Sequence, residues 1–198
     1  WVLEHAARQL KQWQSVGITE LLLAVNISAL QFAQPGFVQH VIELVTKAGV
    51  KPQQIELELT EAVALKNPQA ASLIMKELSA AGFSLSIDDF GTGYSSMSYL
   101  KGFAVDRLKI DQSFIRELQV SPNDQAIVKA IVQMAHSLGM RTIAEGVETQ
   151  QQQDFLSAQY CDEIQGYFFS KPLSAEQFEL FFNTHTKQAK PYPTSKAF

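Results

Sequence analysis

The chain has 198 residues, of which 46% are hydrophobic and 18% charged, so it is globular rather than disordered and can bury the core of one domain. Its formal net charge of -4 excludes the overall basic surface typical of proteins that bind nucleic acid polymers or anionic membranes. No apolar run approaches the roughly 20 residues of a membrane-spanning helix. Cys161 is the only cysteine, so we expect a protein without an internal disulfide in a reducing compartment.

Helical and strand patterns alternate along the chain. In chain order they predict a helix at 1–15, a strand at 21–25, a helix at 37–49, a strand at 55–59, a helix at 68–82, strands at 83–87 and 105–110, a helix at 124–138, a strand at 141–144, a helix from Thr149, a strand at 163–165 and a helix from Ser174. This alternation predicts an α/β protein with a parallel sheet covered by helices, either doubly wound or part of a (β/α)8 barrel. Apolar spacing stops near residue 186, so we expect one domain at 1–185 and a flexible tail at 186–198.

Polar side chains stand in or directly after the predicted strands, and the carboxyl ends of parallel strands are where α/β proteins build their binding sites. They are Asn26, Glu58, Asp88, Asp89, Lys109, Glu145, Glu148 and Gln165. Converging carboxylate and amide oxygens favour Mg²⁺, Mn²⁺ or Ca²⁺ over zinc. There are more carboxylates than one ion needs, so we expect a two-metal site that activates water and clamps a phosphate. Lys109 would orient the water or neutralise a phosphoryl oxygen, or else form a structural salt bridge inside the barrel.

The most distinctive segment runs from Asp88 to Ser96. Gly91 and Gly93 follow the paired aspartates and permit a tight loop with positive φ. Ser96 replaces the third glycine of a dinucleotide-binding fingerprint, so a Rossmann interpretation fails. The segment is either a loop that carries two metal ligands and then contacts substrate or a second subunit, or a plain turn between a strand and a helix.

Taken together, these residues resemble the EAL-domain phosphodiesterases, which hydrolyse the bacterial messenger cyclic di-GMP to linear pGpG. The matching stretches are 25–28, 58–61, 88–96, 106–111, 144–148, 165–167 and 171–172, and their order and spacing fit from about residue 1 to 183. The resemblance implies a TIM-like (β/α)8 barrel with one antiparallel strand. It also implies a homodimer formed through the loop near Ser95 and the helix after Lys109, and a parent protein fused to GGDEF or sensor domains. The location would be cytoplasmic, although upstream domains could anchor the parent protein to a membrane.

The resemblance also assigns roles to residues. Two Mg²⁺ or Mn²⁺ ions, with Ca²⁺ inhibitory, would be held by Asn26, Glu58, Asp88, Asp89, Glu145 and Gln165. Lys109 would position the attacking water, Glu145 would act as the base, and Asp88 would complete the catalytic set. The substrate would contact Asn26, Lys109, Gln165, Gly166, Tyr167 and Pro172, while Glu61, Ser95 and Glu148 would stabilise loops.

The Glu-Ala-Leu motif that gives the family its name is absent from this sequence. In the family pattern, two strands that carry a metal-binding Glu precede the helix predicted at 1–15. We therefore expect the first two of eight strands to be missing and the activity of this chain alone to be reduced or absent, because a barrel that lacks strands cannot close. One alternative is an inactive EAL domain that binds cyclic di-GMP as a sensor. Another is a different barrel enzyme with a carboxylate ring, such as an enolase-type lyase.

Overall fold

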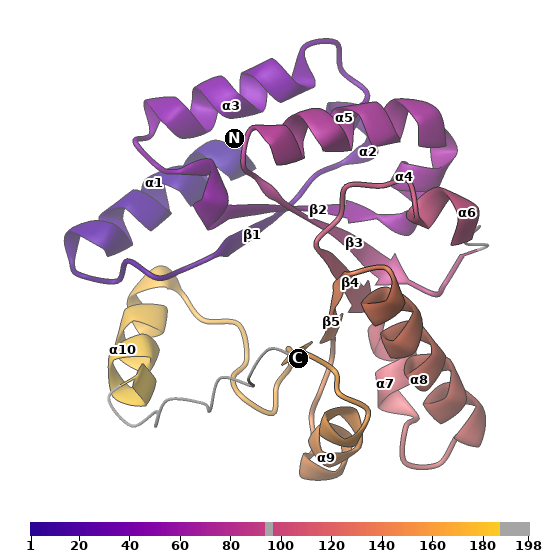
Figure 1. Ribbon diagram of the computed structural model, residues 1–198. Coiled ribbons are helices and arrows are strands. Elements are labelled where there is room, and N and C mark those ends of the chain that lie inside the picture. The colour runs from indigo at the N-terminus through magenta and orange to yellow at the C-terminus, as the bar shows by residue number, and fades with distance from the viewer. Residues whose placement is uncertain (94–96, 187–198) are drawn as a thin grey trace.

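The computed structural model describes residues 1–93 and 97–186 and contains one six-stranded sheet (Figure 1). The strands are β1 (Leu23–Asn26), β2 (Ile55–Thr60), β3 (Ser84–Phe90), β4 (Arg107–Ile110), β5 (Arg141–Ala144) and β6 (Glu163–Ile164). They lie in chain order and every neighbouring pair is parallel. The six predicted strands and their parallel arrangement are confirmed, and the antiparallel strand that the resemblance implies is not among the described strands.

Helices follow most strands and lie along the outside of the curved sheet (Figure 1). The longer ones are α1 (Val2–Ser15), α3 (Phe37–Lys47), α5 (Pro68–Ala80), α8 (Pro122–Ser137), α9 (Gln150–Ala158) and α10 (Ala175–Thr186), all of which the sequence predicts. The short ones are α2 (Ala29–Phe32), α4 (Glu61–Lys66), α6 (Met97–Leu100), α7 (Gln112–Arg116) and the 3-10 turn η1 (Pro52–Gln54). These short helices escape prediction because three to six residues hold at most two helical turns, too few for a periodic pattern.

The alternation of side chains along each strand separates the apolar core from the charged interior. In β2, Leu57 and Leu59 are at most 1% exposed and belong to the hydrophobic core, whereas Glu58 between them points to the other face. β4 repeats this pattern, with Leu108 in the core and Lys109 on the charged face. The concave face of the sheet therefore collects the charged residues that the site uses.

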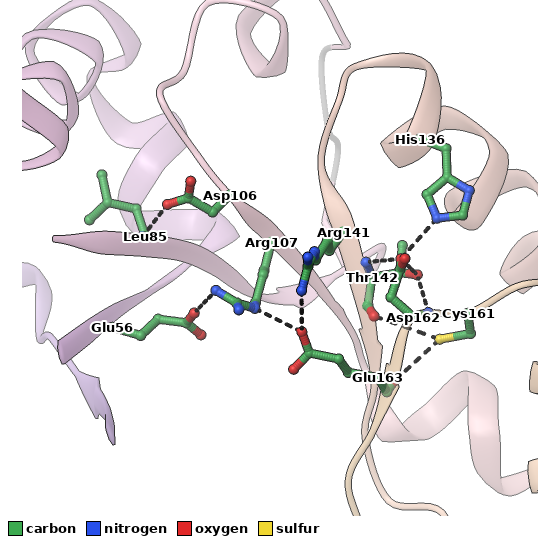
Figure 2. Close-up of polar contacts among 10 residues, drawn as sticks. All are labelled: Glu56, Leu85, Asp106, Arg107, His136, Arg141, Thr142, Cys161, Asp162 and Glu163. Carbon is green, nitrogen blue, oxygen red and sulfur yellow. Dashed lines mark hydrogen bonds and ion pairs between the residues drawn. The ribbon is translucent and has the colours of Figure 1, made fainter. Parts of the chain in front are cut away.

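A network of ion pairs crosses the concave face at the amino ends of the strands (Figure 2). The Arg107 guanidinium on β4 lies 2.6 Å from the Glu56 carboxylate on β2 and 3.1 Å from the Glu163 carboxylate on β6. One side chain therefore connects β4 to both β2 and β6, neither of which is its direct neighbour in the sheet. Burial raises the pKa of Glu56 against the opposing effect of Arg107. Arg141 lies 3.7 Å from Glu163. Because Glu56 and Arg107 are largely buried, removing either one would leave the other as an unpaired buried charge and destabilise the fold.

The sheet is an incomplete TIM-like barrel, since β1 and β6 each pair on one side only among the described residues. A cleft of about 730 Å³ opens on the concave face between these edge strands, with α10 along its side. The predicted tail at 186–198 lies outside the described residues except for Thr186, the last residue of α10. Over the described ranges, no helix combines the length and apolar character needed to cross a bilayer.

Candidate active site

One buried ammonium group binds three carboxylates at the carboxyl ends of the strands. Lys109 on β4 is 4% exposed, and its Nζ lies 2.9 Å from Glu58 Oε1, 3.0 Å from Asp88 Oδ1 and 2.8 Å from Glu145 Oε1. Although burial opposes it, hydrogen bonds to Glu145 and Glu58 raise the pKa of Lys109, so the side chain stays charged. Residues from β2, β3, β4 and the end of β5 thus meet at one point, as the sequence predicts.

A bulge in β3 brings the paired aspartates to the same place. Between two pairs of partners, Ile87 with Leu108 and Phe90 with Ile110, β3 advances by three residues while β4 advances by two. Asp89 adopts a positive φ of 55°, which interrupts the normal alternation of side chains along the strand. As a result, carboxylate oxygens of Asp88, Asp89 and Glu145 all lie within 4.8 Å of one another.

The electrostatics of this cluster favour a bound cation. Burial, followed by repulsion from Asp88 and Asp111, raises the pKa of Asp89 above its ordinary value. Burial also raises the pKa of Glu145, against the attraction of Lys109. Four carboxylates, those of Glu58, Asp88, Asp89 and Glu145, face a single ammonium, which leaves a surplus of negative charge. Carboxylate oxygens at this spacing are the ligands that hard divalent cations prefer, so the residues present fit a metal ion.

Asp111 is a site residue that the sequence reasoning left without a role. It directly follows β4, and its charge and hydrogen bond act on the Asp89 carboxyl. Its Oδ1 also accepts a hydrogen bond of 2.9 Å from the Ser113 backbone and so caps α7. The signal was available, because Asp111 lies two residues after Lys109 and therefore at the same edge of the sheet.

Glu61 connects α4 to the loop after the paired aspartates. The side chain is 5% exposed, and its Oε2 accepts a hydrogen bond of 3.0 Å from the backbone N–H of Gly91. A Cβ atom at Gly93 would lie 2.5 Å from Glu61 Oε1, so a larger residue there would displace the Glu61 carboxylate. The hydrogen bond thus ties the first residue of α4 to the loop after β3.

The remaining predicted residues lie around this cluster at different distances from it. Asn26 ends β1 opposite Glu58 in the sheet register. Gln165 follows β6, where its backbone N–H donates to Ala144, and it lines the cleft together with Gly166 and Glu58. Three other predicted residues, Glu148, Tyr167 and Pro172, are exposed to solvent. The carboxylate of Glu148 is not one of the three that bind Lys109. Ser95 lies outside the described residues.

A parallel sheet curled into part of a barrel, with an acidic cluster at the carboxyl ends of its strands, defines a TIM-like α/β protein with a candidate divalent-cation site. The family model described as "EAL domain" matches residues 1–172, so the chain belongs to the EAL domain family. The predicted family and fold class are thereby confirmed.

Relatives and solved structures agree with this assignment. The chain is 45% identical over 177 residues to the bifunctional diguanylate cyclase/cyclic di-GMP phosphodiesterase MucR of Pseudomonas aeruginosa, covering 89% of this chain and 26% of that protein. The structure described as "PaMucR Phosphodiesterase, c-di-GMP complex" matches with a TM-score of 0.87 at 44% identity, covering 90% of this chain and 72% of that one. A manganese/cy-diGMP complex of Klebsiella pneumoniae BlrP1 matches with a TM-score of 0.76 at 32% identity, over 86% of this chain and 44% of that one. The chain thus spans about a quarter of the length of MucR.

Proposed function

We propose that this chain is the catalytic part of a metal-dependent phosphodiesterase that hydrolyses cyclic di-GMP to linear pGpG. The observation that carries the proposal is the acidic cluster in which Lys109 bridges Glu58, Asp88 and Glu145 within 3.0 Å. Support comes from MucR, which is named as a cyclic di-GMP phosphodiesterase, and from the PaMucR structure, which is a complex with c-di-GMP. The functional unit would be residues 1–185.

The cofactor would be Mg²⁺ or Mn²⁺, with two ions and with Ca²⁺ inhibitory. BlrP1 complexes with manganese and with calcium support divalent cations at the related site. The ligands would be Asn26, Glu58, Asp88, Asp89, Glu145 and Gln165, of which Asp88, Asp89 and Glu145 have oxygens within 4.8 Å of one another. Asp111 would act through its hydrogen bond with Asp89. Bound cations would lower the pKa of water and offset the charge of the phosphate.

The chain's own residues would carry the proton and hold the phosphate. Glu145 would take a proton from the attacking water while its Oε1 remains hydrogen-bonded to Lys109. The Lys109 ammonium would orient that water and neutralise a phosphoryl oxygen. The water oxygen forms the new bond to phosphorus as one P–O bond of the ring breaks, and the leaving oxygen takes a proton from solvent. The guanine and phosphate groups would contact Gln165, Gly166, Tyr167 and Pro172.

Chromatography of cyclic di-GMP incubated with the full-length parent protein and Mn²⁺ tests this function, because this chain alone is expected to have reduced or no activity. We expect pGpG to accumulate, EDTA to stop the reaction and Asp88→Asn to slow it by a factor of 100 or more, of the order typical for loss of a charged group at a phosphoryl site. Cyclic di-GMP binding without pGpG in the full-length parent protein would assign the sensor function instead. A reaction that continues in EDTA would contradict the metal-dependent mechanism.

We also propose a homodimer formed through the segment near Ser95 and through α7, and a parent protein that joins this unit to GGDEF or sensor domains. The second proposal is supported by MucR, which is named as bifunctional and is about four times as long as the matched region. A cytoplasmic location is proposed because the single cysteine suits a reducing compartment. Glu148 would stabilise its loop through its backbone N–H, which donates to Gln152 Oε1 at 2.7 Å.

A further inference from the structure

A run of four glutamines, Gln150–Gln153, begins α9, and Gln152 differs from its neighbours. Gln152 is 6% exposed, whereas Gln150 and Gln151 are exposed to solvent. Its Oε1 accepts hydrogen bonds from two backbone N–H groups, that of Glu148 at 2.7 Å and that of Thr149 at 3.0 Å. Its Nε2 donates to the Ile115 carbonyl at 3.0 Å, so both ends of the buried amide have partners. Capping the helix requires only the Oε1 end of this amide, so the hydrogen bond from Nε2 to Ile115 is an additional contact.

The segment that Gln152 holds begins with Glu145 and has little freedom to move. The Glu145 N–H donates to Ile110, and the N–H of Val147 donates to the carbonyl of Gln165 at 3.0 Å. Val147 is fully buried, and a Cβ atom at Gly166 would clash with its backbone. The next two backbone N–H groups, those of Glu148 and Thr149, donate to Gln152 Oε1. Glu148 follows Glu145 by three residues, which is at most about 11 Å of extended chain, so Gln152 holds the same short segment that carries Glu145.

The other end of the Gln152 amide reaches α7, the helix that follows the strand of Lys109. Ile115 is fully buried in α7, so its carbonyl provides a fixed anchor. Gly146, at a φ of 70°, packs so closely on this helix that a Cβ atom there would lie 2.7 Å from Cβ of Gln112. The Glu145 segment and the β4–α7 segment are therefore joined by Lys109 with the Glu145 carboxylate, by Ile110 with the Glu145 N–H, and by Ile115 with Gln152.

We propose that Gln152 is a positioning residue that fixes the Glu145 carboxylate relative to Asp88 and Asp89 for divalent-cation binding. The amide sets the separation between α7 and the segment 145–149, and this separation places the carboxylate within 4.8 Å of the two aspartates. The inference rests on the proposed cation site and extends it to a side chain that touches neither cation nor substrate. Hydrogen-bonding partners outside the ligand shell of metal sites change the affinity by 10- to 100-fold, about the effect expected here.

Three variants measured by Mn²⁺ calorimetry and denaturant unfolding test the proposal. Gln152→Leu removes both ends of the amide at similar volume, whereas Gln152→Glu keeps the acceptor for the two N–H groups and loses the donor to Ile115. Gln151→Leu is the matched control, since it makes the same change at an exposed position of the same helix turn. We expect Mn²⁺ affinity to fall at least tenfold in Gln152→Leu, to fall measurably in Gln152→Glu, and to stay within twofold of the wild type in Gln151→Leu.

Mn²⁺ affinity within twofold of wild type in a folded Gln152→Leu protein would overturn the proposal, even if its unfolding free energy falls, because Gln152 would then be only a structural cap. If Gln152→Leu does not fold, Gln152→Glu decides by the same criterion. Steady-state hydrolysis is measured on the full-length parent protein and its variants, because this chain alone is expected to have reduced or no activity. A parent protein that binds Mn²⁺ but forms no pGpG would contradict the proposed function and leave the Gln152 comparison intact. A wild type that binds no Mn²⁺ would contradict both.

Discussion

Replacing Asp89 by Asn should stabilise the protein without metal and destabilise it with metal. Asn tolerates the left-handed conformation, so the φ of 55° at this position adds little strain to the variant. Asp88 and Glu145 have oxygens within 4.8 Å of the Asp89 carboxylate. Because Asp89 is exposed, the dielectric constant of water applies, and each pair repels by about 0.9 kcal/mol. Asp111 also repels this carboxylate, and the attraction of Lys109 offsets one of the repelling pairs, so the variant should gain about 1–2 kcal/mol of unfolding free energy in EDTA.

Added Mn²⁺ should make Asp89→Asn less stable than the wild type, the reverse of the order expected in EDTA. At 100 times the dissociation constant, a bound ion stabilises the native state by about 2.7 kcal/mol, and a hundredfold weaker affinity reduces the gain to about 0.4 kcal/mol. The assay is guanidinium unfolding in EDTA and in excess Mn²⁺, with Asp154→Asn on α9 as a control that removes an exposed charge far from the cluster in sequence. An Asp89→Asn protein that is less stable than wild type in EDTA and gains as much from Mn²⁺ would refute the reasoning.

The same variant has a predictable dependence on pH. The pKa of Asp89 is raised in the folded state, so its stabilising contribution is present below the unfolded-state pKa of about 3.9 and is lost as pH rises through the folded-state value. The advantage of Asp89→Asn in EDTA should therefore be small near pH 4 and larger at pH 7.5. Unfolding measured at both pH values checks the sign, and an advantage that grows on acidification would contradict it.

Three further substitutions test other parts of the structure. Lys109→Met leaves three buried carboxylates without their cation, so denaturant unfolding in EDTA should show a loss of about 3–5 kcal/mol; an unchanged midpoint would argue against the ammonium as the centre of the cluster. Gly91→Ala places a Cβ atom 2.9 Å from the ring of Phe114 at a φ of 98°, and should lower the unfolding free energy by about 1–3 kcal/mol, measured by thermal denaturation. Despite burial, hydrogen bonds that include the one from His136 lower the pKa of Asp162 (Figure 2). The unfolding free energy therefore declines as pH falls through that lowered pKa. An acid titration of Asp162→Asn should show a shallower decline than that of the wild type.

The sequence predicts the elements whose signal is periodic. β2 alternates apolar and acidic residues, and this alternation places Glu58 on the concave face and Leu57 in the core. The capping spacing of Thr149 with Gln152 correctly predicts the start of α9. The start of α8 differs, because the predicted helix begins at Asp124 whereas Ser121 caps it three residues earlier.

The features that escape prediction depend on contacts between distant residues. Strict alternation would send Asp88 and Asp89 to opposite faces, and the bulge in β3 opposite β4 brings both carboxylates together. Arg107 gives no local signal that it will pair with Glu56 and Glu163, 51 and 56 residues away. The second role of Gln152, its bond to Ile115, depends in the same way on where α7 packs.

A crystal of the protein soaked in Mn²⁺ and measured for anomalous scattering is the sharpest test of the proposed cation site, because it locates the ion itself. The proposed site requires an anomalous peak between the carboxylates of Asp88, Asp89 and Glu145, at the roughly 2.0–2.2 Å expected for oxygen ligands of small divalent cations. It also requires that the peak disappears in Asp88→Asn. A fully loaded crystal in which these oxygens turn away from one another and no ion lies between them would contradict it.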